Sequence, residues 1–129
     1  MYGFTTTVPG TFDEVVNRVT IELKKEGFGV LTEIDVQSTL KAKLGVDRLP
    51  YKILGACNPE LAHRALEAEP DVGLLLPCNV IVRALESGDN VVGFMDPASV
   101  LGLVARDELK PLGEEVLARL ERVRDALAE

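Results

Sequence analysis

The chain has 129 residues, of which 47% are hydrophobic and 27% are charged, so it contains enough apolar material for one domain spanning 1–129. Its net charge of −7 argues against a nucleic-acid-binding protein, because affinity for a phosphate backbone comes from clustered Lys and Arg. No apolar stretch approaches the roughly 18 residues of a membrane span, and the N-terminus lacks a signal-peptide pattern. We therefore expect a cytoplasmic protein without a membrane partner. A single Gln and only four Asn give a thermophile-like composition.

The first third of the sequence predicts two strands, each followed by a helix. Alternating side chains predict a strand over 2–8, and Thr11 followed three residues later by Glu14 predicts a capping box that opens a helix. Gly27 is a suitable residue for the C-terminal turn of that helix. A second alternating segment over 28–36 predicts a strand, and apolar residues at every fourth position predict a short helix that ends at Leu44.

The middle of the chain predicts a strand, a helix and a longer strand. Residues 51–57 alternate as a strand, and Asn58-Pro59 then supplies a helix cap and a favourable first helical residue. Residues 72–85 form a long apolar segment that predicts a further strand. Pro77 lies inside it and has no N–H to donate to a sheet, so it indicates an edge or a bulge.

The last third predicts a hairpin and two helices. A polar loop over 87–90 leads into a strand over 91–95, and Asp96-Pro97 repeats the cap-and-proline start of a short helix. After Lys110-Pro111, apolar residues recur at the spacing of one helix face: Leu112, Val116, Leu117, Leu120, Val123 and Leu127. Because the hairpin is antiparallel, the expected fold class is α+β, with two layers and a mostly antiparallel sheet packed by helices.

Both cysteines and half of the asparagines fall in two dipeptides, Cys57-Asn58 and Cys78-Asn79. Asn58 is explained as a helix cap, and that places Cys57 just before a helix N-terminus. The positive end of the helix dipole and its free N–H groups favour a thiolate there, or a bound anion. The alternative for Cys57 is a small buried residue at the end of a strand.

The second dipeptide lies within a predicted strand. Cys78 alternates in phase with Leu74, Leu76, Val80 and Val82, which indicates that these side chains face the core. Asn79 then points to the opposite face, where its amide needs a tertiary partner. A bulge at Pro77 would exchange the two faces.

Other chemistries are less well supported by the sequence. His63 is expected on a solvated helix face, and two cysteines alone do not make a zinc site, which takes four ligands. A Cys57–Cys78 disulfide stays open as an alternative. Glu33 and Asp35 share one strand face and form a candidate carboxylate pair, although such pairs are usually the wet side of a strand.

Two stretches resemble a known family. Residues 53–59 (ILGACNP) and 73–80 (GLLLPCNV), together with 33–36 and 40–41, resemble the family catalogued as domain of unknown function 302. The resemblance implies a compact two-layer α+β fold with an antiparallel sheet, an outline like that of the TATA-binding protein, and frequent dimerisation. It implies no established activity and no catalytic residues, and the acidic charge argues against carrying over DNA binding.

Three functions follow as hypotheses. The first is a small binding or sensing domain whose pocket takes a small molecule, an anion, a metal ion or an oxidant, and it predicts a thiol with a lowered pKa. The second is a non-catalytic homodimeric interaction module, and the third is an enzyme that uses Glu33 and Asp35. On the first hypothesis, Lys52 and Arg83 are the cations expected near the motifs. Its full set of ligand-binding residues is Cys57, Asn58, Cys78, Asn79, Lys52 and Arg83.

Overall fold

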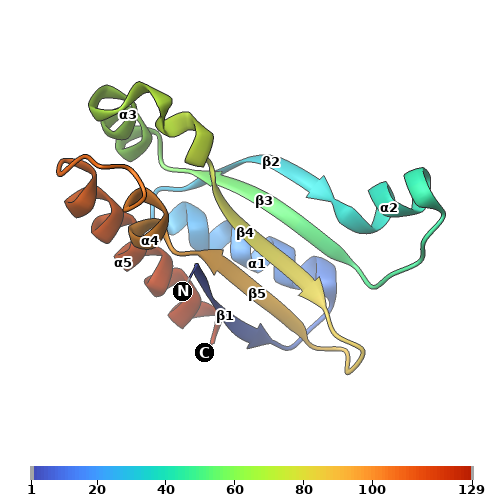
Figure 1. Cartoon of the computed structure of the whole chain (residues 1–129). Coiled ribbons are helices and arrows are strands. Elements are labelled where there is room, and N and C mark those ends of the chain that lie inside the picture. The colour runs from blue at the N-terminus through green and yellow to red at the C-terminus, as the bar shows by residue number, and fades with distance from the viewer. Residues whose placement is uncertain (1, 129) are drawn as a thin grey trace.

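The computed structural model describes residues 2–128 and contains one five-stranded antiparallel sheet (Figure 1). The strands are β1 (Gly3–Val8), β2 (Gly29–Asp35), β3 (Tyr51–Cys57), β4 (Cys78–Ala84) and β5 (Asn90–Met95). They lie in the order β1-β5-β4-β3-β2, and every neighbouring pair is antiparallel. This arrangement confirms the expected α+β class with an antiparallel sheet.

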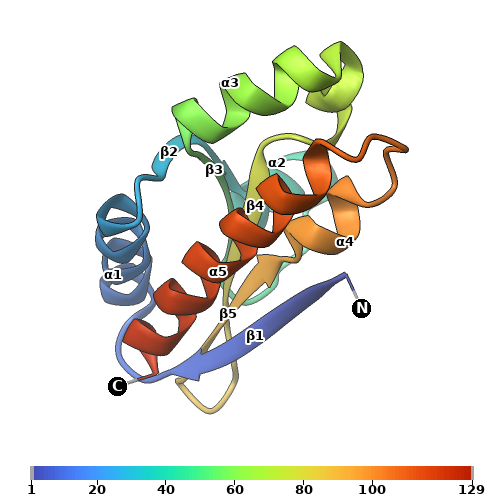
Figure 2. The same ribbon diagram turned by 90° about the vertical axis from the view of Figure 1, so that its left-hand side faces the viewer.

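The helices are distributed unevenly over the two faces of the sheet. They are α1 (Phe12–Lys25), α2 (Val36–Leu44), α3 (Pro59–Ala68), the 3-10 helix η1 (Pro70–Leu75), α4 (Pro97–Leu101) and α5 (Leu109–Leu127). Figures 1 and 2 show α1 behind the sheet, with α3, α4 and the start of α5 at one end and α2 at the other. The face turned toward the viewer in Figure 1 carries no described helix over its central strands.

The core lies between the covered face of the sheet and the helices α1 and α5. Because side chains alternate along a strand, β4 buries one face and leaves the other partly exposed, whereas β5 is buried on both faces along most of its length. Burying each large aliphatic side chain contributes about 1.5–3 kcal/mol. The fully buried residues of this layer include Leu54, Val80, Val82 and Val92 from the strands and Val15, Val19, Leu23 and Leu120 from the helices.

The helix ends predicted from the sequence are present. The backbone N–H of Glu14 donates to Oγ1 of Thr11 at 3.2 Å, which caps α1. At the other end, Gly27 has a φ of 87°, a left-handed conformation that favours glycine, and the N–H of Phe28 donates to the carbonyl of Leu23 at 2.9 Å. Phe28 and Leu23 are both buried, so this turn fixes the entry into β2.

The strand predicted over 72–85 begins later than expected, so the prediction is wrong for residues 72–77. Residues 70–75 form η1, and β4 begins only at Cys78, after a cis peptide bond between Leu76 and Pro77. Leu74, expected to face the core, is 88% exposed. A short apolar run does not distinguish a strand from a helical turn by periodicity, and Pro70 at the first position of η1 favours the helix.

The alternation predicted for β2 is also interrupted. The pairing of β2 with β3 shifts register between Val30 and Thr32, which marks a bulge at Leu31. As an edge strand, β2 has one neighbour, and Ile34 is half-exposed although the predicted alternation places it on the same face as the buried Phe28. The bulge directs Leu31 outward, where it is 68% exposed.

Candidate functional site

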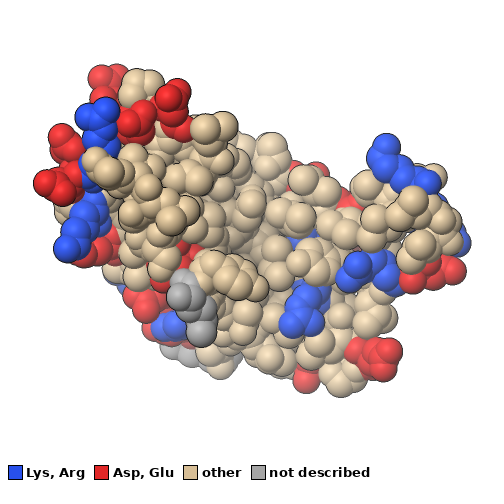
Figure 3. All heavy atoms as spheres, in the orientation of Figure 1, with Lys and Arg blue, Asp and Glu red and all other residues tan. Residues whose placement is uncertain are grey.

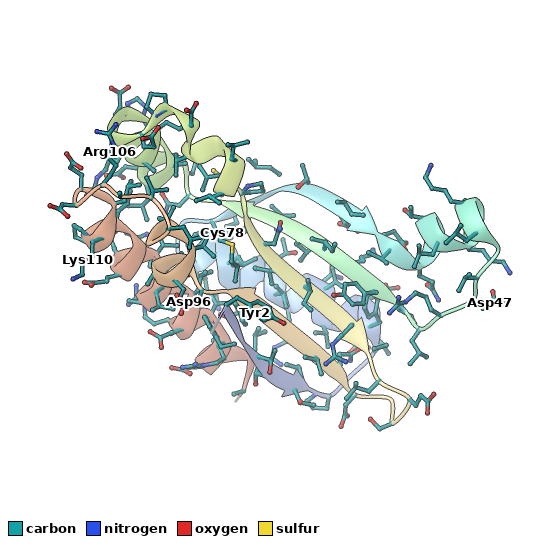
Figure 4. The ribbon with its side chains drawn as sticks, viewed as in Figure 1. Tyr2, Asp47, Cys78, Asp96, Arg106 and Lys110 are labelled. Carbon is teal, nitrogen blue, oxygen red and sulfur yellow. The ribbon has the colours of Figure 1, made fainter. Side chains whose placement is uncertain are left out.

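A cavity of about 360 Å³ opens where the end of β3 meets the start of β4. Its walls come from these strands and from α3, η1, α4 and α5, and its volume is in the range of small-molecule sites. Figure 4 places Cys78 at the start of β4, on the side of the molecule that holds α3 and α4. Its lining residues include Leu31, Thr32, Cys57, Asn58, Ala62, Leu66, Cys78, Met95, Pro97, Leu101, Leu112 and Val116.

Both cysteines line this cavity as free thiols. Cys78 is 8% exposed and stands opposite Ala56 in the ladder between β3 and β4, in phase with the buried Val80 as the sequence predicts. Cys57 follows Ala56 and is half-buried. The antiparallel pairing of β3 and β4 therefore brings the two dipeptides to the same end of the sheet.

Neither thiol has the lowered pKa that the first hypothesis predicts. Burial raises the pKa of Cys57, and burial together with the charge of a Cys57 thiolate raises the pKa of Cys78 to about 11. The helix N-terminus provides little compensation because three of its first four residues have no free N–H to offer a thiolate. Pro59 has no N–H, the N–H of Leu61 is bonded to the Asn58 side chain, and that of Ala62 is bonded to the Asn58 carbonyl.

Asn58 is the helix cap that the sequence predicts. Its Oδ1 accepts the N–H of Leu61 at 3.1 Å, and the side chain is buried. Its amide nitrogen lies against Gly27, where an added Cβ would be only 2.7 Å away. Asn58 therefore joins the end of α1 to the start of α3. Its side-chain oxygen, Oδ1, already accepts a hydrogen bond from the backbone of Leu61.

The other three predicted site residues lie elsewhere. Asn79 is exposed on the uncovered face of the sheet, opposite to the face of Cys78. Nζ of Lys52 is 2.6 Å from Oε1 of Glu33, and the hydrogen bond to Glu33 raises the Lys52 pKa. Arg83 lies near the far end of β4. The structure thus groups Cys57, Asn58 and Cys78 and separates them from Asn79, Lys52 and Arg83.

The carboxylate pair Glu33 and Asp35 has structural contacts. Oδ1 of Asp35 accepts the N–H of Ser38 at 2.9 Å and caps α2, and this hydrogen bond lowers the Asp35 pKa. Glu33 forms the ion pair with Lys52. A carboxyl group that acts as a general acid at neutral pH needs a raised pKa. The lowered pKa of Asp35 is the opposite of what that role requires.

Sequence reasoning missed most of the cavity wall. The apolar spacing of the last helix identified Leu112 and Val116 as buried, but spacing does not distinguish a side chain in the core from one that faces a cavity. Within residues 2–128, no group of three or more His, Cys, Asp and Glu side chains is placed to hold a metal ion. His63 is exposed, 4.0 Å from Glu67.

The five-stranded antiparallel sheet, with helices packed on one face and an apolar cavity at one end, defines a two-layer α+β protein. The family described as "Domain of unknown function DUF302" matches residues 4–127. The chain therefore belongs to this family. The chain is also similar to a protein of known crystal structure, an uncharacterized conserved DUF302 protein from Bacillus stearothermophilus. The two sequences are 33% identical, the match covers 98% of each chain, and the two structures superpose with a TM-score of 0.90. No curated protein matches the chain.

Among residues 2–128, no helix has the length and apolar character needed to cross a membrane.

Proposed function

We propose that the protein binds a small, largely apolar molecule in the cavity beside Cys57 and Cys78. The observation that carries the proposal is the chemistry of the wall. The described lining residues include no charged side chain, although 27% of the chain is charged. Apart from the two thiols, Thr32 and Asn58 are the polar side chains of the described wall, and Asn58 is engaged as a cap. Water in such a space has few hydrogen-bonding partners, so an apolar ligand displaces it favourably.

The opening of the cavity has the same character as its interior. Leu31 and Leu66 line it and are both exposed, and the neighbouring Leu74 is more exposed still. Large apolar side chains gathered at an opening are typical of ligand-binding surfaces. The raised thiol pKa values favour binding over nucleophilic catalysis, because protonated thiols are weak nucleophiles and act as small polarisable wall groups.

The test is a fluorescence titration with the neutral apolar dye N-phenyl-1-naphthylamine. Ala62→Phe places a ring in the cavity and is expected to abolish saturable binding, whereas Ala118→Phe, on an exposed position of α5, leaves it unchanged. Thermal melts establish that both variants fold. Equal binding by Ala62→Phe and wild type, or no saturable binding by wild type, would contradict the proposal.

A second candidate is homodimeric assembly, which the position of α2 supports. This helix buries none of its residues, and Leu44 is 70% exposed on it. The segment 36–49 carries three basic residues and one acidic residue, whereas 59–75, at the other end, carries four acidic residues and one arginine. Two copies related by a twofold axis would place each α2 against the acidic end of the other, across the uncovered sheet face. Figure 3 shows that the centre of this face is mostly uncharged.

Analytical ultracentrifugation tests the assembly. Leu44→Glu is expected to shift the chain to a monomer, whereas Ile21→Glu, also exposed but on α1, leaves the dimer intact. Raised salt is expected to weaken the association, because complementary charges contribute to it. A wild-type monomer at all concentrations contradicts this candidate without affecting the ligand-binding proposal.

A further inference from the structure

A second cavity, of about 280 Å³, lies at the opposite end of the central strands from the cysteines. The segment between α2 and β3 and the end of β4 form its walls. In Figure 3, Lys and Arg side chains appear on the uncovered face between the sheet and α2. The residues that line this cavity are Arg48, Leu49, Pro50, Tyr51, Arg83, Ala84, Leu85 and Glu86.

Two arginines and a tyrosine converge on this space. Tyr51 and Arg83 are directly paired between β3 and β4, so their side chains lie on the same, uncovered face of the sheet. The guanidinium carbon of Arg48 is 5.4 Å from the centre of the Tyr51 ring. Nε2 of Gln37 donates to the carbonyl of Arg48 at 2.9 Å, which holds the segment that carries this arginine.

The charges of these arginines are not neutralised within the chain. Among residues 2–128, eight Lys and Arg side chains lie within 4.0 Å of a carboxylate, and neither Arg48 nor Arg83 is one of them. Glu86 also lines the cavity, but its carboxylate forms no ion pair in the described part of the chain. Two guanidinium groups without an ion-pair partner, both lining one cavity, give this end of an otherwise acidic chain a local positive charge that suits an external anion.

We propose that this cavity binds a phosphate monoester. Each guanidinium offers a planar set of donors that matches two phosphate oxygens, and a dianion neutralises both arginines at once. The Tyr51 hydroxyl is a further donor for the ester. Leu49, Pro50 and Leu85 supply an apolar wall for the organic group. This site shares no lining residue with the cysteine cavity and does not depend on the function proposed for it.

The test is isothermal titration calorimetry of the full chain with phenyl phosphate and inorganic phosphate. Loss of one charge-assisted contact is expected to weaken phenyl phosphate binding at least about tenfold in Arg48→Gln and in Arg83→Gln. Lys110→Gln removes the same charge at the other end of the molecule, where Figure 4 places Lys110, and is expected to bind as wild type does. Glu86→Gln is expected to tighten binding, because it removes the negative charge that lines the cavity.

Three results would overturn the site. No saturable binding by wild type excludes it, and equal weakening in Lys110→Gln and Arg83→Gln shows a general response to net charge. Benzoate binding as tightly as phenyl phosphate shows a carboxylate site instead, such as one for an acidic segment of a second copy. Tighter binding of phenyl phosphate than of inorganic phosphate supports the role of the apolar wall.

Discussion

The Cys78 thiol is held where ionisation is unfavourable, and this makes the stability of the fold dependent on pH. Burial raises its pKa from an ordinary 9.0 to about 11. Between these values the unfolded chain releases the thiol proton while the folded chain retains it. The free energy of unfolding therefore decreases as pH rises from 9.0 toward 11, and below 9.0 the contribution is fully present. For a shift of this size, the loss is about 1.4 kcal/mol by about pH 10.

Urea denaturation followed by circular dichroism at about pH 8 and about pH 10 measures this loss. Cys78→Ala is the reference, because Lys and Tyr titrate in both proteins and the cavity left by the shorter side chain costs the same at either pH. The wild type is expected to lose about 1.3 kcal/mol more than Cys78→Ala between the two conditions. Equal losses would refute the argument, since they would show that the thiol ionises as easily in the folded chain as in the unfolded one.

Two further predictions concern the helix caps and the close contact between β3 and β2. Asn58→Ala is expected to reduce the free energy of unfolding by about 1–2 kcal/mol in urea titrations, because a buried cap is lost, whereas Asn58→Asp retains an acceptor and loses less. Asp35→Ala, at the cap of the exposed α2, is expected to cost less than Asn58→Ala. Gly55→Ala is expected to cost about 1–3 kcal/mol in a thermal melt, because its Cβ would collide with Oγ1 of Thr32.

Each of these predictions has a contrary outcome. If Asn58→Asp is as unstable as Asn58→Ala, the contact of the amide nitrogen with Gly27 matters more than the cap. If Gly55→Ala melts at the wild-type temperature, β2 moves away from β3 at low cost. In that case the edge strand beside the cavity is less constrained than its pairing with β3 indicates.

The elements that the sequence predicted well are those with two concurring local signals. The start of α3 combines a preferred capping residue, Asn58, with proline at the first helical position, and both act within one turn. The end of α1 combines lysines in its last turn with Gly27. Residues 72–76 had only apolar character, which a strand and a 3-10 turn satisfy equally, and that segment was predicted wrongly.

The cavity was less predictable because most of its wall comes from elsewhere in the chain. The two dipeptides identified three lining residues, yet Leu101 comes from α4, which packs on α5 and η1, and Val116 from α5, which packs on α3, and no local pattern specifies this packing. The expectation for Cys57 failed for a related reason. Proximity to a helix N-terminus was visible in the sequence, but only the geometry shows that Asn58 accepts the N–H groups of Leu61 and Ala62.

Antiparallel pairing divides the predicted set of ligand-binding residues into two groups. Strands β3 and β4 run in opposite directions, so the end of β3 at Cys57 meets the start of β4 at Cys78. For the same reason, the start of β3 at Lys52 meets the end of β4 near Arg83. Five residues along a strand correspond to about 17 Å. A small molecule that contacts the thiols therefore does not reach Arg83. The cations expected beside the cysteines belong to the other end of the sheet, where Arg83 lines a separate cavity with Arg48.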